Sequence, residues 1–207
     1  MTSQSTTQST DALAPLPIRC TSSDCDAGLH CFKATQKLRK QGREGACRSC
    51  GEQLVNWHRV HGRRLDDVDF TFAQLRLELI RHHFWHLDFD DKALAHALRK
   101  GRLRLHAAAR QRLQNSVRRA ANPWDGRQTP WRGNTIYYAQ HAVAACCRTC
   151  IAYWHAIPKD HDLTEAELRY LTGLVLRYLD ERLPGLPDEP QQVPRFRKSA
   201  QRWAEEA

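Results

Sequence analysis

Apolar side chains recur at every third or fourth position along three long stretches of the chain, a spacing typical of amphipathic helices. The first stretch covers residues 69–87 and the second covers residues 91–121, where Gly101 interrupts the pattern. The third covers residues 162–183. These stretches predict a mainly α-helical fold.

Local signals define the boundaries of the third helix and the nature of the segment before it. Thr164 or Asp162 is a suitable N-terminal cap, because an acidic first turn follows. The sequence Leu183-Pro184-Gly185 is a stop signal. Residues 122–135 are rich in turn-forming residues, and we expect a short strand from Ile136 to Tyr138.

The basic residues are concentrated in one segment of the chain. The sequence has 32 Lys and Arg against 23 Asp and Glu, and residues 92–132 contain eleven basic side chains against Asp125 alone. The planar guanidinium group suits phosphate oxygens. One interpretation is therefore nucleic-acid binding through Arg102, Arg104, Arg110, Arg112, Arg118, Arg119 and Arg127. The other is a solvated helix face whose arginine stems cover apolar surface.

The eight cysteines are the strongest chemical signal in the sequence. We expect no signal peptide and no membrane-spanning helix, and hence a cytoplasmic protein. Reducing conditions there disfavour disulfides. The repeated Cys-x-x-Cys spacing, at Cys47/Cys50 and Cys147/Cys150, favours zinc binding over disulfides, thiol redox chemistry or simple packing of buried thiols.

Two groups of candidate zinc ligands follow, one in each half of the chain. The N-terminal candidates are Cys20, Cys25, Cys31, Cys47 and Cys50.

The C-terminal candidates are His141, Cys147, Cys150 and His155, with Cys146 in reserve. One straight helix cannot present all four on one side, so a zinc site requires a chain break near the cysteines. The alternative is a buried helix in which the thiols act as small core residues.

A third cluster, RHHFWH, spans residues 81–86 and places His82 and His86 one helical turn apart, with His83 between them. Such a pair is able to bind an ion from one helix face or to serve in acid–base chemistry. Packed or surface histidines are the alternative.

The chain divides into four parts on these signals. Residues 1–17 form a disordered, Ser/Thr-rich tail, and residues 18–90 form an N-terminal Cys-rich zinc module plus a helix. Residues 91–184 contain the basic helical segment and a C-terminal His/Cys zinc domain, and residues 185–207 form a polar tail. Because both halves contain Cys-Arg-x-Cys followed by Trp-His, the zinc-stabilised domains are possible products of a diverged tandem duplication.

Four segments of the second half together resemble a known family. They are DGRQTP (125–130), AQHAVAACCRTC (139–150), YWHAIP (153–158) and LTEAEL (163–168). This set is similar to the bacterial domain of unknown function 4186 family over roughly residues 100–184. The resemblance implies that the polar turn and the His/Cys cluster belong to one site, and that the Cys-rich N-terminal portion is an extension. It implies no activity.

Three functions compete at this point. We favour a zinc-binding protein that binds nucleic acid through residues 92–132, where Trp124 and Trp131 either stack on bases or pack the two halves together. One alternative is a metal-dependent hydrolase or nuclease that uses the C-terminal His/Cys site with the polar residues Asp125, Gln128 and Thr129. A protein-interaction scaffold is the other.

Overall fold

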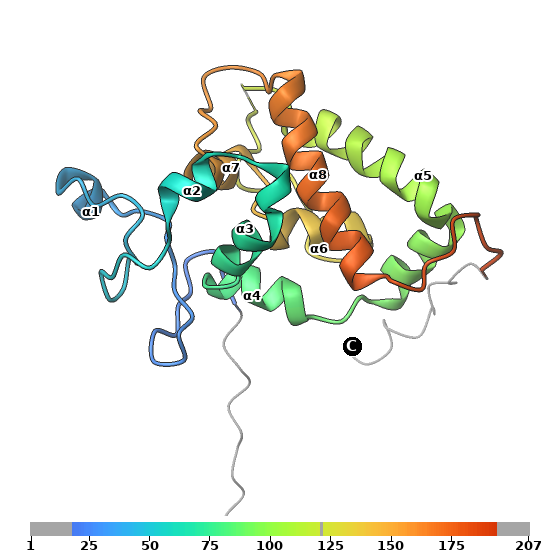
Figure 1. Cartoon of the computed structure of the whole chain (residues 1–207), viewed down its shortest axis with the longest axis horizontal. Helices are drawn as coiled ribbons and strands as arrows, with labels where there is room; N and C mark the ends of the chain where they lie inside the picture. The colour runs from blue at the N-terminus through green and yellow to red at the C-terminus, as the bar shows by residue number, and fades with distance from the viewer. Residues whose placement is uncertain (1–17, 121, 194–207) are drawn as a thin grey trace, which may run out of the picture.

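The computed structural model of the chain describes residues 18–120 and 122–193, which are mainly helical (Figure 1). The tail predicted at residues 1–17 lies outside the described residues, as do residues 194–207 of the tail predicted from residue 185. Within the described ranges there are isolated β-bridges but no strand. The helical elements are α1 (Gln36–Lys40), α2 (Trp57–His61), η1 (Leu65–Asp67, a 3-10 helix), α3 (Val68–Leu75), α4 (Leu79–His86), α5 (Asp91–Val117), α6 (Thr135–Ala142), α7 (Arg148–His155) and α8 (Glu165–Arg182).

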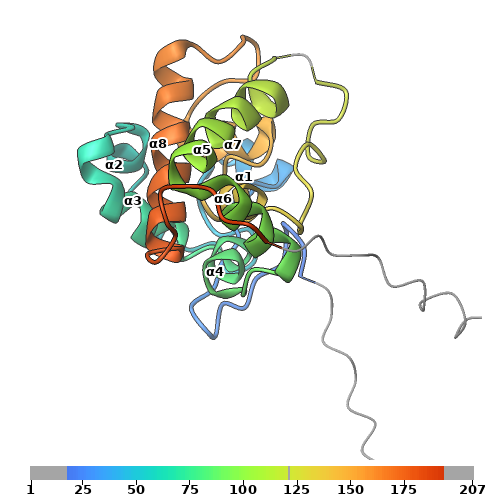
Figure 2. The ribbon, with the colours of Figure 1, turned by 90° about the vertical axis from the view of Figure 1, so that its right-hand side faces the viewer.

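The helices pack around one hydrophobic core. Helix α8 packs against α5 and α6, α4 packs against α6, and α2 packs against α7 (Figures 1 and 2). Apolar side chains of α8 such as Leu171 and Tyr178 are buried at the centre. Phe32 and Cys47, from the segment before α2, belong to the same buried cluster. The N-terminal segment is therefore packed onto the helical core.

The helix predicted at 69–87 is two helices, so its predicted continuity is wrong. Helix α3 ends at Leu75 and α4 begins at Leu79, because Glu78 adopts an extended conformation. The backbone of His30 bridges to this point, with its N–H donating to the Leu77 carbonyl at 2.8 Å. The Leu79 N–H donates to the His30 carbonyl at 2.9 Å. Hydrogen bonds to a distant segment thus replace those of a continuous helix.

The interruption predicted at Gly101 is confirmed. Helix α5 is kinked there, and Gly101 has a φ of 66°, a backbone angle that residues other than glycine rarely adopt. Residues 187–189 pass close to this kink, and the Arg102 N–H donates to the Pro187 carbonyl at 2.8 Å. The glycine therefore permits both the kink and the close approach of the backbone.

We expect Gly101→Ala to lower the free energy of unfolding by about 2–4 kcal/mol, from strain at positive φ and from overpacking. An added Cβ would lie 2.5 Å from the Asp188 carbonyl oxygen. The matched control is Gly185→Ala, where an added Cβ meets nothing within 4 Å. Urea denaturation measures both variants, and equal stability of the two would contradict this role of Gly101.

The strand predicted from Ile136 to Tyr138 is wrong, because these residues lie in α6. Asn134 caps this helix, and its side-chain oxygen accepts a hydrogen bond from the Ile136 N–H at 2.9 Å. Tyr138 and Ile136 are buried against neighbouring helices. The apolar run was therefore one buried face of a helix.

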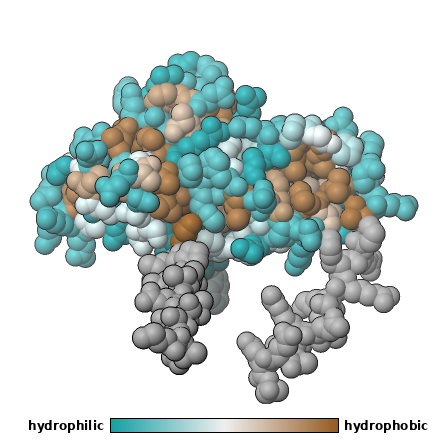
Figure 3. Space-filling model, turned by 90° about the horizontal axis from the view of Figure 1, so that it is seen from below, coloured by the Kyte–Doolittle hydropathy of each residue, from teal (hydrophilic) through white to brown (hydrophobic). Residues whose placement is uncertain are grey.

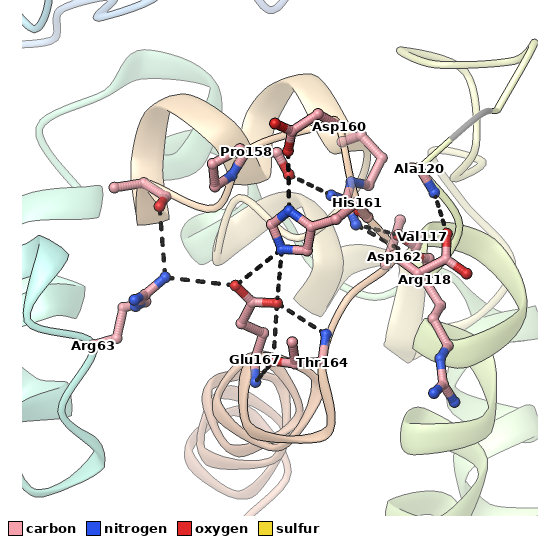
Figure 4. Close-up of polar contacts among 12 residues, drawn as sticks. Arg63, Val117, Arg118, Ala120, Pro158, Asp160, His161, Asp162, Thr164 and Glu167 are labelled. Atoms are coloured by element: carbon pink, nitrogen blue, oxygen red, sulfur yellow. Dashed lines mark hydrogen bonds and ion pairs between the residues drawn. The ribbon is translucent and has the colours of Figure 1, made fainter.

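The cap predicted at Thr164 is confirmed, and it forms part of a polar network at the start of α8 (Figure 4). Glu167 accepts a hydrogen bond from the Thr164 N–H at 2.9 Å, and the Glu167 N–H donates to the Thr164 hydroxyl at 3.2 Å. His161 and Arg63 also contact the Glu167 carboxylate. The loop before α8 is thereby linked to the segment that follows α2 and to α8 itself.

The surface carries apolar patches separated by polar side chains, as Figure 3 shows for one face. In the part of the chain that the structure describes, no helix combines the length and the apolar character that crossing a membrane requires.

Candidate metal centres

Four potential metal ligands meet in the N-terminal segment, which we call the N-terminal centre. One side-chain atom from each of Cys25, His30, Cys47 and Cys50 lies within 4.8 Å of the others. The Sγ atoms of Cys25 and Cys47 are 3.8 Å apart, and the Cys50 Sγ is 3.5 Å from the His30 Nδ1. Three sulfurs and one imidazole nitrogen are a complete ligand set for a tetrahedral metal ion.

Tight turns hold these ligands in place. The Gly51 N–H donates to the Cys47 carbonyl at 2.9 Å, and Gly51 has a φ of 83°, so the turn at the Cys-x-x-Cys sequence requires glycine. Burial alone would raise the pKa of the Cys47 thiol, but hydrogen bonds with the backbone of Cys31, Cys50 and Ser49 lower it to about 6. Cys47 is therefore ready to lose its proton and bind a metal ion.

The structure brings together three of the five N-terminal residues predicted from the sequence and leaves two outside the group. Cys31 is fully buried, and its thiol donates to the Cys20 carbonyl at 3.5 Å. Neither Cys20 nor Cys31 joins the N-terminal centre. His30 occupies the fourth position, and its place between Cys25 and Cys31 in the sequence was the signal that could have identified it.

The second group, the three-cysteine centre, consists of Cys146, Cys147 and Cys150. Their Sγ atoms lie within 4.8 Å of one another, and each residue is 4–5% exposed. Helix α6 ends at Ala142 and α7 begins at Arg148, so the chain breaks near the cysteines as predicted. Cys147 caps α7 and accepts a hydrogen bond from the Cys150 N–H at 3.4 Å.

The two Cys-x-x-Cys sequences therefore lie in different local structures, one in a turn and the other at the start of a helix. The tandem duplication stays a prediction.

A buried ion pair between Arg81 and Glu78, which was not predicted from the sequence, contacts the three-cysteine centre. The guanidinium of Arg81 donates to the Cys150 Sγ at 3.2 Å and the Cys146 Sγ at 3.7 Å. Its Nε donates to Glu78 at 3.0 Å, and both charged side chains are 0% exposed. Glu78 also accepts hydrogen bonds from the Trp154 indole at 2.7 Å and the Tyr153 hydroxyl at 2.9 Å.

This arrangement favours one negative charge among the three thiols. Hydrogen bonds from Cys146 and Cys147, followed by the charge of Arg81, hold the pKa of Cys150 well below its usual value. Hydrogen bonds with Cys147 and Cys150 and complete burial raise the pKa of Cys146. A divalent cation would neutralise the negative charge that forms when the other two thiols lose their protons. Metal binding at this centre must therefore release protons.

One side of the three-cysteine centre faces a polar pocket of about 190 Å³. His141 lines this pocket and is 4% exposed, with its Nε2 donating to the Thr129 and Pro130 carbonyls. Its Nδ1 is buried and has no hydrogen-bond partner in the described residues. The remaining lining residues are Cys20, Lys33, Asp125, Gly126, Thr129, Trp131, Cys146, Cys147 and Thr149.

The polar turn predicted to share a site with the cysteines does lie beside them. Asp125 accepts hydrogen bonds from the Thr149 hydroxyl at 2.8 Å and Lys159 at 2.9 Å. The Thr129 hydroxyl donates to the Cys146 carbonyl at 2.8 Å. Gln128 instead accepts from the Arg148 N–H at 3.2 Å and does not line the pocket.

His155 lies outside the three-cysteine group. It is fully buried, with its Nε2 2.9 Å from the Val143 carbonyl and its Nδ1 3.2 Å from the Tyr170 hydroxyl. These contacts satisfy both ring nitrogens of a neutral histidine. Its role here is packing.

Burial lowers the pKa of His155 from 6.5 to about 4, which predicts acid sensitivity. As the pH falls from about 6.5 towards 4, the unfolded chain binds a proton at this residue and the folded chain does not, so stability is lost over that window by up to about 3 kcal/mol. Unfolding free energies of the wild type and His155→Gln should therefore converge as the pH falls. Equal pH dependence of the two proteins would contradict this.

The predicted nucleic-acid-binding arginines divide into two groups. Arg102 contacts Asp180 at 3.0 Å, and both Arg110 and Arg118 contact Glu165. Arg112 donates to the Gln128 carbonyl at 2.6 Å. Three others are exposed, namely Arg104, Arg119 and Arg127.

The histidines of the 81–86 segment do not form a centre among the described residues. The rings of His82 and His86 lie 4.0 Å apart, but no third ligand completes a group.

A comparison with known protein families finds a match for more than half of the chain. The sequence model of the family described as "Domain of unknown function (DUF4186)" matches residues 69–180. The match includes Glu78, Arg81 and the three-cysteine centre and excludes the N-terminal centre. No solved structure is a significant match to the chain.

Proposed function

We infer the function from the chain's own residues, because the chain belongs to the domain of unknown function 4186 family, whose description states no activity. We propose that it is a zinc-binding protein with one structural and one reactive centre. The N-terminal centre holds zinc with four ligands and fixes the N-terminal segment. The three-cysteine centre holds zinc with an open coordination position and supports hydrolysis in the polar pocket.

The distances in the N-terminal centre support zinc. A tetrahedral ion with Zn–S of about 2.3 Å and Zn–N of about 2.0–2.1 Å separates two sulfurs by about 3.8 Å and a sulfur from a nitrogen by about 3.6 Å. The corresponding distances between Cys25 and Cys47 and between Cys50 and His30 are 3.8 and 3.5 Å. Four protein ligands leave no open position, which is typical of structural zinc.

The observation that supports a reactive role is that Cys146 and Cys147 of the three-cysteine centre line one pocket together with His141. A zinc ion with three protein ligands and an open position activates water for hydrolysis. Because the His141 Nε2 donates to backbone carbonyls, its buried Nδ1 keeps a free lone pair. Burial lowers the pKa of His141 to about 4, so the imidazole is neutral near pH 7 and we propose it as a weak general base.

Zinc-dependent hydrolysis of p-nitrophenyl acetate and bis(p-nitrophenyl) phosphate tests the reactive role. We expect His141→Gln to retain zinc and lose about 100-fold or more of the rate. The control His155→Gln should retain both the zinc and the hydrolysis rate, because His155 lies outside the pocket. No hydrolysis by the zinc-loaded protein above that of the apo protein would refute this role.

Nucleic-acid binding is the second candidate function. The observation that favours it is the exposure of Trp124, at 67%, between Arg119 and Arg127 in a segment beside the polar pocket. Exposed aromatic and basic side chains together bind single strands. Replacing both arginines with Ala should flatten the salt dependence of oligonucleotide binding, whereas Lys37→Ala with Lys40→Ala, outside residues 92–132, serves as a charge-matched control.

We also propose the cytoplasm as the location. All eight cysteines are free, and a reducing compartment keeps such thiols available for metal.

A further inference from the structure

A second cavity, which we call the aromatic cleft, lies between α1, α2 and α7 and has a volume of about 640 Å³. In Figure 1, α2 lies next to α7 and α1 lies farther out on the same side. This volume is in the range of about 300–1,000 Å³ that is usual for small-ligand sites.

Positive charge lines the aromatic cleft. Lys33, Arg39 and Lys159 contribute to its wall against the single acidic residue Glu44. Lys159 is paired with Asp125 at 2.9 Å, whereas Lys33 and Arg39 have no ion-pair partner among the residues that the structure describes. Two cations therefore remain available to an anionic ligand. An ammonium and a guanidinium together suit a phosphate group.

An indole side chain held in a fixed orientation also lines the cleft. Trp57 is half-buried, and its indole N–H donates to the Gly45 carbonyl at 3.0 Å. Its ring packs against Trp154 and Phe32, with centroids 5.0 and 5.8 Å away. A Cβ on Gly45 would lie 2.3 Å from the Trp57 Nε1, so only glycine permits this placement. A rigid indole is a suitable surface for stacking a base.

The aromatic cleft adjoins the polar pocket of the three-cysteine centre. Lys33 and Thr149 line both cavities. Lys159 lines the cleft and contacts Asp125, which lines the pocket. A phosphate bound at Lys33 would therefore lie where the two cavities meet.

We propose that the aromatic cleft binds one nucleotide unit, with its base against Trp57 and its phosphate at Lys33 and Arg39. The assignment rests on the proposed function in one respect, because it makes a nucleotide phosphoester the substrate class of the three-cysteine centre. The nucleotide is either free or part of a single strand, since both present the same ring and phosphate.

Fluorescence anisotropy of the full chain tests the proposal with two probes, ribose-labelled adenosine 5′-monophosphate and an end-labelled oligothymidylate. Saturable binding of either probe is expected, and the tighter one identifies the source. Lys33→Ala with Arg39→Ala should weaken binding at least about tenfold, because two charge-assisted contacts are lost.

The control is Lys37→Ala with Lys40→Ala. Both lysines are exposed on the same short helix as Arg39, and neither lines the cleft. This pair should change the affinity less than about twofold, because exposed charges at a distance are screened. Absence of saturable binding of both probes, or an equal loss in the two double variants, would overturn the proposal.

The two proposals fail separately. Saturable binding of either nucleotide probe by a wild-type chain that shows no zinc-dependent hydrolysis supports the cleft and refutes the reactive centre. Hydrolysis of p-nitrophenyl acetate without binding of either nucleotide probe refutes the cleft and leaves the reactive centre in place.

Discussion

Alanine in place of Cys47 is expected to lower the melting temperature of the zinc-loaded protein by about 10 °C or more. Structural zinc contributes about 10–16 kcal/mol in small zinc domains, and 1 kcal/mol corresponds to about 2–4 °C for a chain of this size. Residues 18–56 contain only α1 and isolated bridges as regular structure, so this segment depends strongly on the N-terminal centre. Calorimetry with and without a zinc chelator measures the effect.

Cys31→Ala is the matched control. Cys31 and Cys47 are both 0% exposed, but only Cys47 belongs to the N-terminal centre. The control removes one buried sulfur and should cost about 1 kcal/mol with unchanged sensitivity to the chelator. Equal losses in the two variants would mean that the thiols act only as core residues.

Arg81→Met is expected to lower the free energy of unfolding by about 3–5 kcal/mol, the usual cost of breaking a buried ion pair. The substitution leaves the Glu78 carboxylate buried without its cation and removes the donors to Cys146 and Cys150. Zinc affinity of the three-cysteine centre should fall as well, because groups that support metal ligands tune affinity by about 10–100-fold. Denaturation and competition with a chromophoric chelator measure the two effects.

Arg64→Met provides the comparison for this ion pair. Arg64 contacts Asp66 at 2.6 Å, but both side chains are 67% exposed, and such pairs contribute little to stability. No measurable change is expected. If Arg81→Met also leaves the free energy of unfolding and the zinc affinity unchanged, the buried pair does not support the three-cysteine centre.

The sequence predicted helices well where local signals determine them. Gly101 and Thr164 act through their own backbone or the next turn, so their effects were readable from neighbouring residues. The break between α3 and α4 depends on hydrogen bonds from His30, more than 40 residues away, and no local pattern reports it. Ile136 was misassigned because a short apolar run is compatible with a strand or a buried helix.

The cysteine spacing indicated metal chemistry, but it did not determine which residues share a centre. Cys31 and His30 are adjacent in the sequence, and long-range backbone hydrogen bonds hold both residues while His30 contacts Cys50. Glu78 and Arg81 are charged residues within the stretch predicted as one helix, and no role was predicted for them from the sequence. Their burial depends on Trp154 and Cys150, which come from the other half of the chain.

The free positive charge of the arginine segment was likewise not predictable from the local sequence. Asp180 and Glu165 lie more than 45 residues after the arginines that they contact, so the local count overstated the free positive charge. Folding places these acids on α8 beside α5. Local composition alone therefore cannot distinguish an open cationic face from one that is internally paired.

Elemental analysis of the purified chain tests the central claim most directly, that two groups of thiols bind zinc. We predict two zinc ions per wild-type chain, one in Cys47→Ala and one in Cys146→Ala, since each variant loses a ligand of a different centre. A wild-type chain without stoichiometric metal, with a melting temperature that a chelator does not change, would contradict the account.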